Sequence, residues 1–483
     1  MEEPVGLLIG AARRRLKQAV ALLSCAACVP FAEARIEGDV APSPAVQVAG
    51  RPPAPAAPPN PESEKLAALA ARGGTVSLAQ LIDFALRNSP DTRATWADAR
   101  AAAALVGSRQ GAWFPTLEVD GNLQYTHQVF GTLAQFEYWS WGPSVAISWL
   151  MLDFGSRGSD VDEAKALLAA ANMAHDQAVE DLVLRVEQAY TQYQAAKALL
   201  AASKASVSEA QTSYDAAGQR RATGLATVAD VLQAKTALSQ AQLNLQTVEG
   251  QVETLRGAVA TAVGVPATVP VEAEDLPDVN VDLQIQRIDD LVTQAEKERP
   301  DLARARAQAV AAQSHADSVR WRGWPQLVFN GAGGLNYFIQ RGAPEGNNLT
   351  AAMQLRIPLF NGWKDSYDAA QAAEQAKAAQ ARAESVEQQA ILSVWTSYQG
   401  VRTAVQRVKT ARDLLASADE SAKVAQGRYK EGVGSILDVL TAQSALAAAR
   451  AQEVQSRADW LLAVASLAHD TGSLGPPGQG AAK

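Results

Sequence analysis

The most constraining feature of this sequence is an internal duplication. Four short segments recur in the same order about 208 residues further along the chain. The matching pairs are residues 88–91 with 298–301, 113–115 with 323–325, 152–157 with 359–364, and 223–232 with 431–440. Because chance rarely produces four markers at nearly constant spacing, we expect two copies of one structural unit. We place the copies at residues 75–264 and 288–472, joined by a Pro- and acid-rich linker at 265–287.

Each copy shows the pattern of one helix, then two strands, then a long helical hairpin. We expect the first helix at about residues 78–110 and its counterpart at about 288–321. Both stretches end near a tryptophan and a proline, where the helical hydrophobic period stops. Proline disfavours helical geometry in the residue before it, so it is a natural place for a helix to end.

Four segments alternate between apolar and polar residues, as strands with one apolar face do. They are residues 116–128 and 144–152 in the first copy, and 326–339 and 349–359 in the second. Glycines weaken the pattern of the third segment. The lengths of these segments are typical of tilted strands that cross a bilayer. The nearby tryptophans are typical of residues at the interfaces of a membrane. The alternative is the edge of a soluble β-sandwich, because alternation does not say what covers the apolar side.

The hairpins begin with long proline-free runs, at residues 156–223 and 363–430. Apolar residues follow heptad spacing in both runs. They are Val179, Val183, Val186, Tyr190, Tyr193 and Leu200 in the first run, with Lys197 as the exception, and Val394, Tyr398, Val401, Val405 and Val408 in the second. At 1.5 Å per residue such helices reach roughly 100 Å, a length that suits a tube more than a compact domain. Frequent alanines favour the close packing of helices in the wall of such a tube.

The predicted fold class is therefore mainly α with membrane β, and the strand count has a consequence for assembly. Four strands cannot close a barrel, for which about eight are the minimum, and open sheet edges are not tolerated in lipid. We expect the chain to oligomerise if these strands span a membrane. The strand count by itself allows an assembly of two, three or four copies.

The N-terminal region predicts export from the cytoplasm. Basic residues at 13–17 precede an apolar stretch at 19–23, and a small-residue cleavage pattern follows at 32–34. This order is typical of a secretory signal peptide, which we place at residues 1–34. The alternative is a lipoprotein signal, in which cleavage leaves Cys25 for lipidation.

Composition narrows the possible functions. The net charge of -8 and the sequence pI near 5.3 argue against a nucleic-acid partner. Both cysteines, Cys25 and Cys28, lie in the predicted signal peptide, so cleavage after Ala34 leaves no thiol for disulfide, metal or nucleophilic chemistry. Residues 35–74 are rich in Pro and Ala and are expected to be flexible, as is the C-terminal tail at 473–483.

No motif indicates catalysis, a metal or a cofactor. Asp153-Phe154-Gly155 imitates a kinase signature, but no phosphate-binding loop or catalytic loop accompanies it, and it is better interpreted as a strand-to-helix turn. The four histidines at positions 127, 175, 315 and 469 show no ligand spacing. We therefore expect the protein not to be an enzyme.

The two hairpin turns carry the sequence's most specific motif. Residues 220–227 are followed by Asp-Val-Leu at 230–232, and residues 428–435 by Asp-Val-Leu at 438–440. In this respect, and in its layout over about residues 75–472, the chain resembles the TolC-type outer-membrane factor family. The resemblance implies a homotrimer with twelve strands in the outer membrane lipid and a helical tunnel in the periplasm. It also implies a tip that docks with a periplasmic adaptor (membrane fusion) protein and an inner-membrane pump or ABC transporter.

The same resemblance implies a gate at the periplasmic tip, with Asp230, Tyr429 and Asp438 at the matching positions. Carboxylates that converge around a symmetry axis repel one another, raise a pKa or recruit a cation. The chain departs from some family members in carrying Gly434 and Thr441, which leaves the number of constriction rings open. The alternative is that Asp230 and Asp438 cap the helices that begin after the turns.

The adaptor-facing surface is expected at the two turns. The residues concerned are Arg220, Gly224 and Leu225 in the first turn, and Arg428, Gly432 and Val433 in the second. The function that follows is a passive exit duct of a tripartite exporter, with small toxic compounds as cargo. One alternative is a type I secretion duct for an unfolded polypeptide, and another, from a different class, is a periplasmic or surface coiled-coil interaction protein.

Overall fold

The computed structural model describes residues 75–130, 134–281, 287–339 and 346–474, all within one compact unit of the chain, Glu37–Lys483. Its helices are α3 (Leu78–Asn88), α4 (Pro90–Gly111), α5 (Ser156–Ala222), α6 (Val228–Val263), α7 (Ile288–Glu298), α8 (Pro300–Arg322), α9 (Lys364–Lys430) and α10 (Ile436–Asp470). Its strands are β1 (Thr116–Phe130), β2 (Ala134–Leu152), β3 (Gln326–Phe338) and β4 (Gly346–Arg356). The predicted signal peptide with Cys25, the segment 35–74, part of the linker and most of the tail lie outside the described residues.

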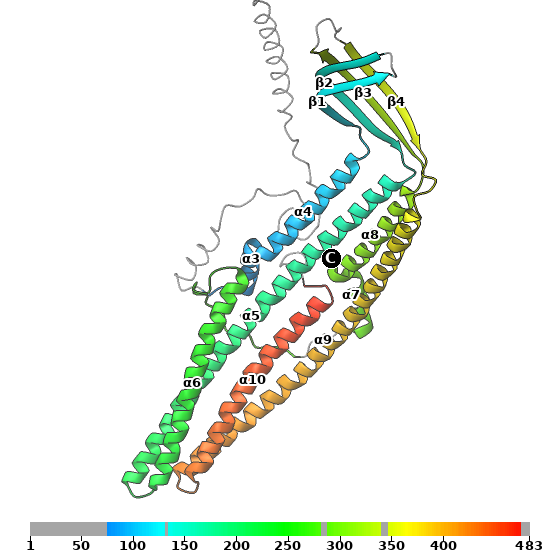
Figure 1. Ribbon diagram of the computed structural model, residues 1–483. Helices are drawn as coiled ribbons and strands as arrows, with labels where there is room; N and C mark the ends of the chain where they lie inside the picture. The colour runs from blue at the N-terminus through cyan, green and yellow to red at the C-terminus, as the bar shows by residue number, and fades with distance from the viewer. Residues whose placement is uncertain (1–74, 131–133, 282–286, 340–345, 475–483) are drawn as a thin grey trace, which may run out of the picture. The chain divides into compact units, whose positions relative to one another are not determined.

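The element order confirms the duplication. The series α3, α4, β1, β2, α5, α6 is followed by α7, α8, β3, β4, α9, α10, so every element of the first repeat has a counterpart in the second (Figure 1). The sheet lies at one end and the two hairpin turns lie at the other, with the helices between them. The predicted fold class, mainly α with a small sheet and two tandem repeats, is confirmed.

The first helix of each repeat differs from the prediction, because it is two helices. The predicted helix at 78–110 breaks at Ser89, and the one at 288–321 breaks at Arg299. Each break residue precedes a proline and adopts an extended ψ, 125° at Ser89 and 121° at Arg299. The proline ring excludes helical geometry at the preceding residue, while the proline itself serves as the first residue of the next helix.

The strands form one antiparallel sheet in the order β1-β2-β3-β4. The register places Leu123 opposite Trp141, Trp141 opposite Tyr337, and Phe329 opposite Met353, so that apolar residues of all strands share one face. The other face carries Gln124, Ser140 and their polar neighbours. The strand boundaries differ from the prediction most at β2, which begins ten residues before position 144, and at β4, which covers 346–356 instead of 349–359. Strand β1 ends at 130 instead of 128, and β3 at 338 instead of 339. The outer strands β1 and β4 each have one unpaired edge.

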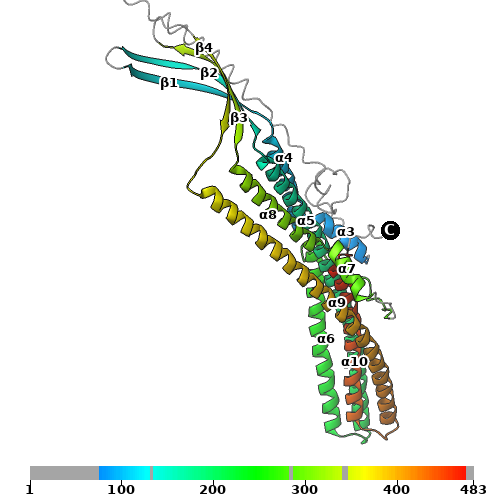
Figure 2. The ribbon, with the colours of Figure 1, turned by 90° about the vertical axis from the view of Figure 1, so that its right-hand side faces the viewer.

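The helical hairpins are as long as the proline-free runs predict. The helices α5 and α9 each contain 67 residues, which corresponds to roughly 100 Å at 1.5 Å per residue. Figure 2 shows both hairpins running away from the sheet. The heptad residues Val179, Val186 and Val394 are fully buried. Lys197 interrupts the heptad pattern because its ammonium group donates to the Ala273 carbonyl of the linker, at 2.7 Å.

The described part of the linker lies across the hairpins and is held by side chains from both. Tyr190 of α5 donates to the Val76 carbonyl at 3.1 Å and accepts from the Glu274 backbone N–H at 3.2 Å. Arg457 of α10 donates to the carbonyls of Leu276 and Pro277, at 2.8 and 2.7 Å. The linker therefore ties the two repeats together. None of the helices in the described ranges combines the length and hydropathy needed to cross a membrane.

Candidate functional site

The two hairpin turns lie at the end of the helices far from the sheet, and they share one construction. Gly224 and Gly432 follow the ends of α5 and α9 in the left-handed region, at φ 77° and 81°. The backbone N–H of the next residue then donates to a carbonyl in the last turn of the long helix. Leu225 donates to the Arg220 carbonyl at 2.8 Å, and Val433 donates to the Arg428 carbonyl at 3.0 Å. A side chain at φ near 80° is strained, so glycine lets each long helix end at a defined residue.

The helices that follow the turns begin with capping boxes. The Thr227 hydroxyl accepts from the Asp230 backbone N–H at 3.2 Å, and the Asp230 carboxylate accepts from the Thr227 N–H at 2.7 Å. Ser435 and Asp438 repeat this exchange at 3.2 and 3.1 Å. Both candidate gate carboxylates therefore cap helices in the single chain, as the alternative interpretation expects. Capping and gating are compatible, because each carboxylate has further acceptor sites.

Asp438 lies in an open groove between α9 and α10. Arg428, Leu437 and Thr441 line the same groove. The hydrogen bonds from Ser435, together with the nearby Arg428 guanidinium, hold the pKa of the Asp438 carboxyl below its usual range. In the single chain this carboxylate is thus ionised and exposed, which is the state that a cation-attracting ring requires.

Tyr429 joins the two turns. It is buried, and the Arg220 guanidinium of the first hairpin lies 4.7 Å from its ring centroid and donates to its backbone carbonyl. Burial raises the pKa of the Tyr429 phenol, the charge of Arg220 lowers it, and that of Asp230 raises it. The sequence prediction placed Arg220 on the adaptor-facing surface. The structure shows it half-buried between the turns, in a contact across 209 residues of sequence.

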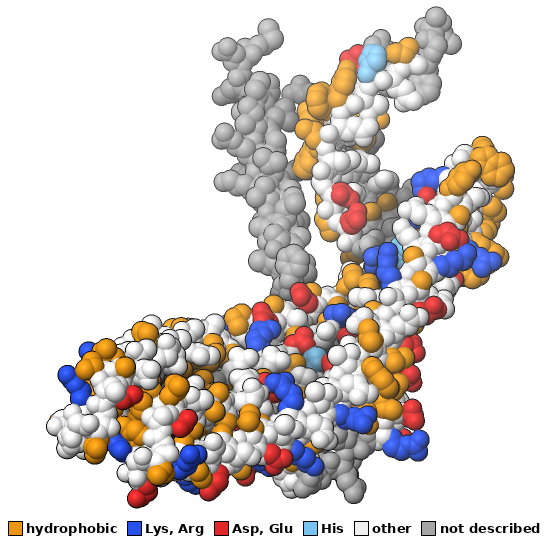
Figure 3. Space-filling view, turned by 90° about the horizontal axis from the view of Figure 1, so that it is seen from below, with side chains coloured by type: hydrophobic (Ala, Val, Ile, Leu, Met, Phe, Trp, Pro, Cys, Tyr) orange, Lys and Arg blue, Asp and Glu red, His pale blue; other side chains and the backbone are white. Residues whose placement is uncertain are grey.

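The other predicted adaptor-facing residues lie at the surface of the turns. Leu225 and Val433 are 71% and 68% exposed, and Gly224, Arg428 and Gly432 are exposed as well. Leucine and valine side chains exposed to this degree at an apex are candidates for contact with another protein. Figure 3 views the molecule from this side and shows apolar and charged side chains intermixed.

The ion pair at the turn between β2 and α5 was only partly predicted by the sequence. The turn at Asp153 holds a buried ion pair, in which the Asp153 carboxylate accepts from the Arg157 backbone N–H at 2.7 Å and from its guanidinium at 3.2 Å. Arg157 also donates to the Leu150 carbonyl at 2.5 Å and lies 4.3 Å from the Trp113 ring centroid. This turn fixes the direction in which β2 continues into α5, which confirms its interpretation as a strand-to-helix turn. Asp and Arg four residues apart were the available signal.

Within the described ranges, no group of three or more His, Cys, Asp or Glu side chains is arranged to hold a metal ion.

Comparison with known protein families gives two matches along the chain. The family model described as outer membrane efflux protein matches residues 81–265 and again residues 291–473. The two matched segments correspond to the two structural repeats and together cover more than half of the chain.

Individual proteins are similar over most of their length. Protein CyaE of Bordetella pertussis is 26% identical over 420 residues, which are 83% of this chain and 85% of that protein. The outer membrane protein OprJ of Pseudomonas aeruginosa is 26% identical over 76% of this chain and 78% of that protein. Among solved structures, the outer-membrane channel OprN has a TM-score of 0.75 at 19% identity, over 89% of this chain and 99% of that one.

Proposed function

We propose, on the premise that this chain belongs to the outer membrane efflux protein family, that three copies of it form an exit duct for small toxic compounds. The chain is a channel of the outer membrane with a periplasmic tunnel, and it is not an enzyme. It serves as the outer-membrane component of a tripartite export system. The number of copies, the cargo, the adaptor and the pump are the parts we propose.

The observation that carries the proposal is the sheet. Its strands share one apolar face, with Leu117 and Leu123 of β1 and Leu349 of β4 largely exposed, and its other face is polar. An apolar exterior and a polar interior are what a water-filled barrel in lipid requires. Because β1 and β4 have unpaired edges, pairing of β4 with β1 of the next copy would close the sheet. Three copies would contribute twelve strands.

The helices support the same closure. Within the chain α10 packs along α5, whereas α6 has no comparable contact with α9 among the described residues. The faces of α6 and α9 that correspond to the α10–α5 contact are therefore available to a second copy. Apolar side chains are exposed on both of these helices, Leu232 and Leu243 on α6 and Leu392 and Trp395 on α9. Burying such a surface stabilises an assembly by about 25 cal/mol per Å².

At the tip we propose that Asp230, Tyr429 and Asp438 form the gate and that Leu225, Arg428 and Val433, with the glycine turns, contact a periplasmic adaptor protein. The exposure of Leu225 and Val433 and the ionised state of Asp438 support this assignment. Arg220 is better placed to hold the two turns together, because it packs on Tyr429.

Small compounds are favoured as cargo by the description of the family and by the name of one relative. The toluene efflux pump outer membrane protein TtgC of Pseudomonas putida is 24% identical over 412 residues, 81% of this chain and 82% of that protein. Export of an unfolded polypeptide remains the second candidate. A strain that lacks the chain distinguishes them: sensitivity to a panel of organic toxicants with an unchanged secreted proteome supports efflux, and the reverse result supports polypeptide secretion.

The experiment that tests the duct itself is planar-bilayer conductance of the detergent-purified mature protein, with the oligomeric mass measured on the same sample. Discrete channels from a particle of three copies support the proposal. A particle that needs no detergent and conducts no ions would contradict it and favour the coiled-coil interaction protein.

A further inference from the structure

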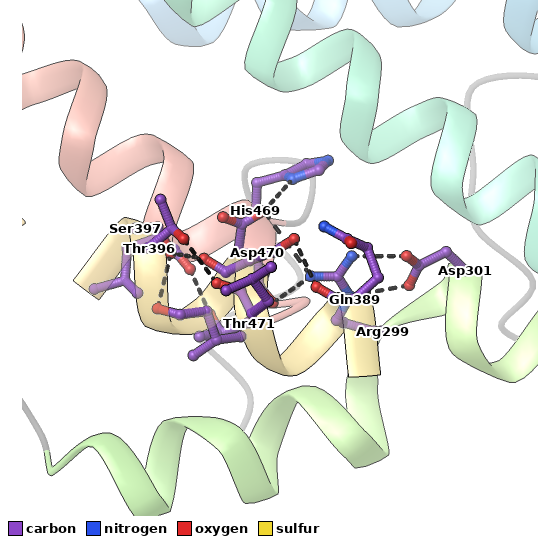
Figure 4. Close-up of polar contacts among 12 residues, drawn as sticks. Arg299, Asp301, Gln389, Thr396, Ser397, His469, Asp470 and Thr471 are labelled. Carbon is purple, nitrogen blue, oxygen red and sulfur yellow. Dashed lines mark hydrogen bonds and ion pairs between the residues drawn. The ribbon is translucent and has the colours of Figure 1, made fainter. Parts of the chain in front are cut away.

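The C-terminal end of α10 lies in a charged junction with two other parts of the chain. Arg299, at the break between α7 and α8, donates to the Asp470 backbone carbonyl at 2.9 Å (Figure 4). Its guanidinium also forms a two-pronged pair with the Asp301 carboxylate, at 3.0 and 2.7 Å. The break of the second repeat is thus bonded directly to the last turn of α10.

His469 extends this junction to the first repeat. Its Nε2 lies 2.9 Å from the Asp181 carboxylate of α5, and its Nδ1 lies 3.3 Å from the Asp470 carboxylate. A neutral imidazole has one N–H and therefore donates to only one of two carboxylates. Since both ring nitrogens face carboxylate oxygens, the arrangement is complete only when His469 carries two protons and a positive charge.

The backbone around this junction is closely packed, so the charged contacts have a fixed geometry. Gly472 adopts φ 74°, and a Cβ there would lie 2.8 Å from the Glu298 carbonyl carbon. Thr471 is buried, and its hydroxyl donates to the Leu467 carbonyl at 2.9 Å. The end of α10 therefore rests against the α7–α8 break with little room to adjust.

The titratable and charged groups around His469 come from α5, α10 and the α7–α8 break. Asp181 and Asp470 contact it directly, the Glu180 carboxyl interacts with its charge, and Asp176, Arg299 and Asp301 act on these neighbouring groups. Figure 4 shows that α9 contributes the uncharged Gln389, Thr396 and Ser397 to the same junction. Glu180 is buried, which raises its pKa from 4.5 to about 8, while His469 lowers it and the three aspartates raise it. Near neutral pH the buried Glu180 is thus uncharged.

The first repeat has no such junction at the equivalent place. Thr261 and Ala262 correspond to His469 and Asp470, and Ser89 corresponds to Arg299. Asp91, the counterpart of Asp301, pairs with Arg185 at the surface. The charged junction is therefore a property of the second repeat, where α10 contacts α5 within the chain.

We propose that His469 is a proton-operated clasp of the helical tunnel: as an imidazolium it joins Asp181 of the first repeat to Asp470 of the second, and its deprotonation in alkali releases the end of α10. This inference concerns the helices of the channel and is independent of its cargo and of the gate.

The direction of the pH dependence follows from the proton balance. Hydrogen bonds from His469 to Asp181 and Asp470 raise its pKa from 6.5 to about 9, against the effect of burial. The clasp therefore contributes its full stabilisation below pH 6.5 and loses it as the pH rises through about 9. Glu180 gains a negative charge above about pH 8, which adds repulsion among the carboxylates. Both changes loosen the junction in alkali.

Hydrogen exchange of the full-length, detergent-purified protein tests the clasp, with rates corrected for intrinsic base catalysis. Peptides covering residues 462–472 report on the end of α10, and those covering 254–264 report on the equivalent end of α6, which is the internal control. Between pH 7 and 9.5 we expect protection of the α10 end to fall about tenfold, less than the full pKa shift allows because the side chain is partly exposed. Protection of the α6 end should stay constant.

Two variants separate the clasp from general packing. His469→Gln should show low protection of the α10 end at pH 7 and, at pH 9.5, only the smaller further fall that ionisation of Glu180 causes. His469→Arg, which keeps its charge at both pH values, should retain protection at pH 9.5. Equal protection of the wild-type α10 end at both pH values, or a fall in His469→Arg as large as in the wild type, would overturn the proposal.

Discussion

The ends of α6 and α10 occupy the same position in the two repeats, yet different forces hold them. Gly264 and Gly472 both adopt a positive φ and both pack against a proline break. In the first repeat, Val259 and Val263 enter an apolar cluster with α3 and the linker. In the second, the corresponding turn is bonded through Arg299 and His469.

After the duplication, the backbone features were kept in both repeats while the side-chain chemistry diverged. Helix lengths, proline breaks and glycine ends recur because each satisfies a local geometric requirement. The side chains differ because the surroundings differ: the end of α10 meets α5 of its own chain, whereas α6 has no comparable contact with α9 among the described residues. A buried apolar cluster is insensitive to pH, while an ion-paired junction is not.

The greatest loss of stability is expected from truncating a leucine in the apolar clusters of the two repeats. Leu81 of α3 and Leu291 of α7 are counterparts, and both are buried, but Leu81 belongs to a much larger cluster. We expect Leu81→Ala to lower the free energy of unfolding by about 4 kcal/mol and Leu291→Ala by about 2 kcal/mol, because a cavity in a large cluster collapses less. Urea unfolding followed by the helical circular dichroism signal measures both. An equal or larger loss for Leu291→Ala would refute the inference that the cluster around Leu81 contributes more to stability than the cluster around Leu291.

The next effect compares the two breaks. Arg299→Met leaves Asp301 and the Asp470 carbonyl without their donor in a site where the guanidinium is 10% exposed, and we expect a loss of about 2–3 kcal/mol. Ser89→Ala, which removes a helix cap at the equivalent break, should cost about 1 kcal/mol. Urea unfolding of both variants measures the two losses in the free energy of unfolding.

Acid sensitivity provides a further distinction at the same site. Burial by itself would raise the pKa of Asp301, but the hydrogen bonds and charge of Arg299 lower it below 3.8. The pair therefore stabilises the wild type above pH 3.8, and this stabilisation disappears as the pH falls through the lowered value. Arg299→Met should lack this acid-dependent loss. Stability profiles of the wild type and the variant that stay parallel as the pH falls from 4 to 2 would argue against the pair.

Sequence reasoning predicted the features that depend on local pattern. Alternation identified the apolar face of β1 and the heptads identified Val179 and Val394 as buried. It missed the breaks at Ser89 and Arg299, because a proline within an otherwise helical pattern is compatible with a kinked helix as well as with two helices. It also missed contacts between distant segments. His469 and Asp181 are 288 residues apart, and no spacing rule relates them until the repeats are packed.

At the tips, the comparison concerns channel conductance. Asp230 and Asp438 are equivalent caps, but Asp438 is exposed in a groove while Asp230 lies close to Tyr429. We expect Asp230→Ala with Asp438→Ala to raise single-channel conductance and to weaken block by cations at the periplasmic end, because the carboxylates proposed to form the gate are removed. Loss of the two caps should cost about 1 kcal/mol each. Unchanged conductance in planar bilayers would leave helix capping as the role of both carboxylates.

The smallest effect on stability is expected at Arg428, and it separates docking from folding. Arg220 and Arg428 are counterparts in the two turns, yet Arg220 packs on Tyr429 whereas Arg428 is exposed. Charge reversal by Arg220→Glu should cost about 1 kcal/mol through loss of the cation–π contact, and it should loosen the tip. Arg428→Glu should leave assembly in the membrane unchanged and lower export, because this exposed charge is available to the complementary surface of the proposed adaptor. Quantifying assembled oligomer and exported compound in the same cells distinguishes the two: loss of assembly in Arg428→Glu would make this residue structural and remove it from the proposed adaptor surface.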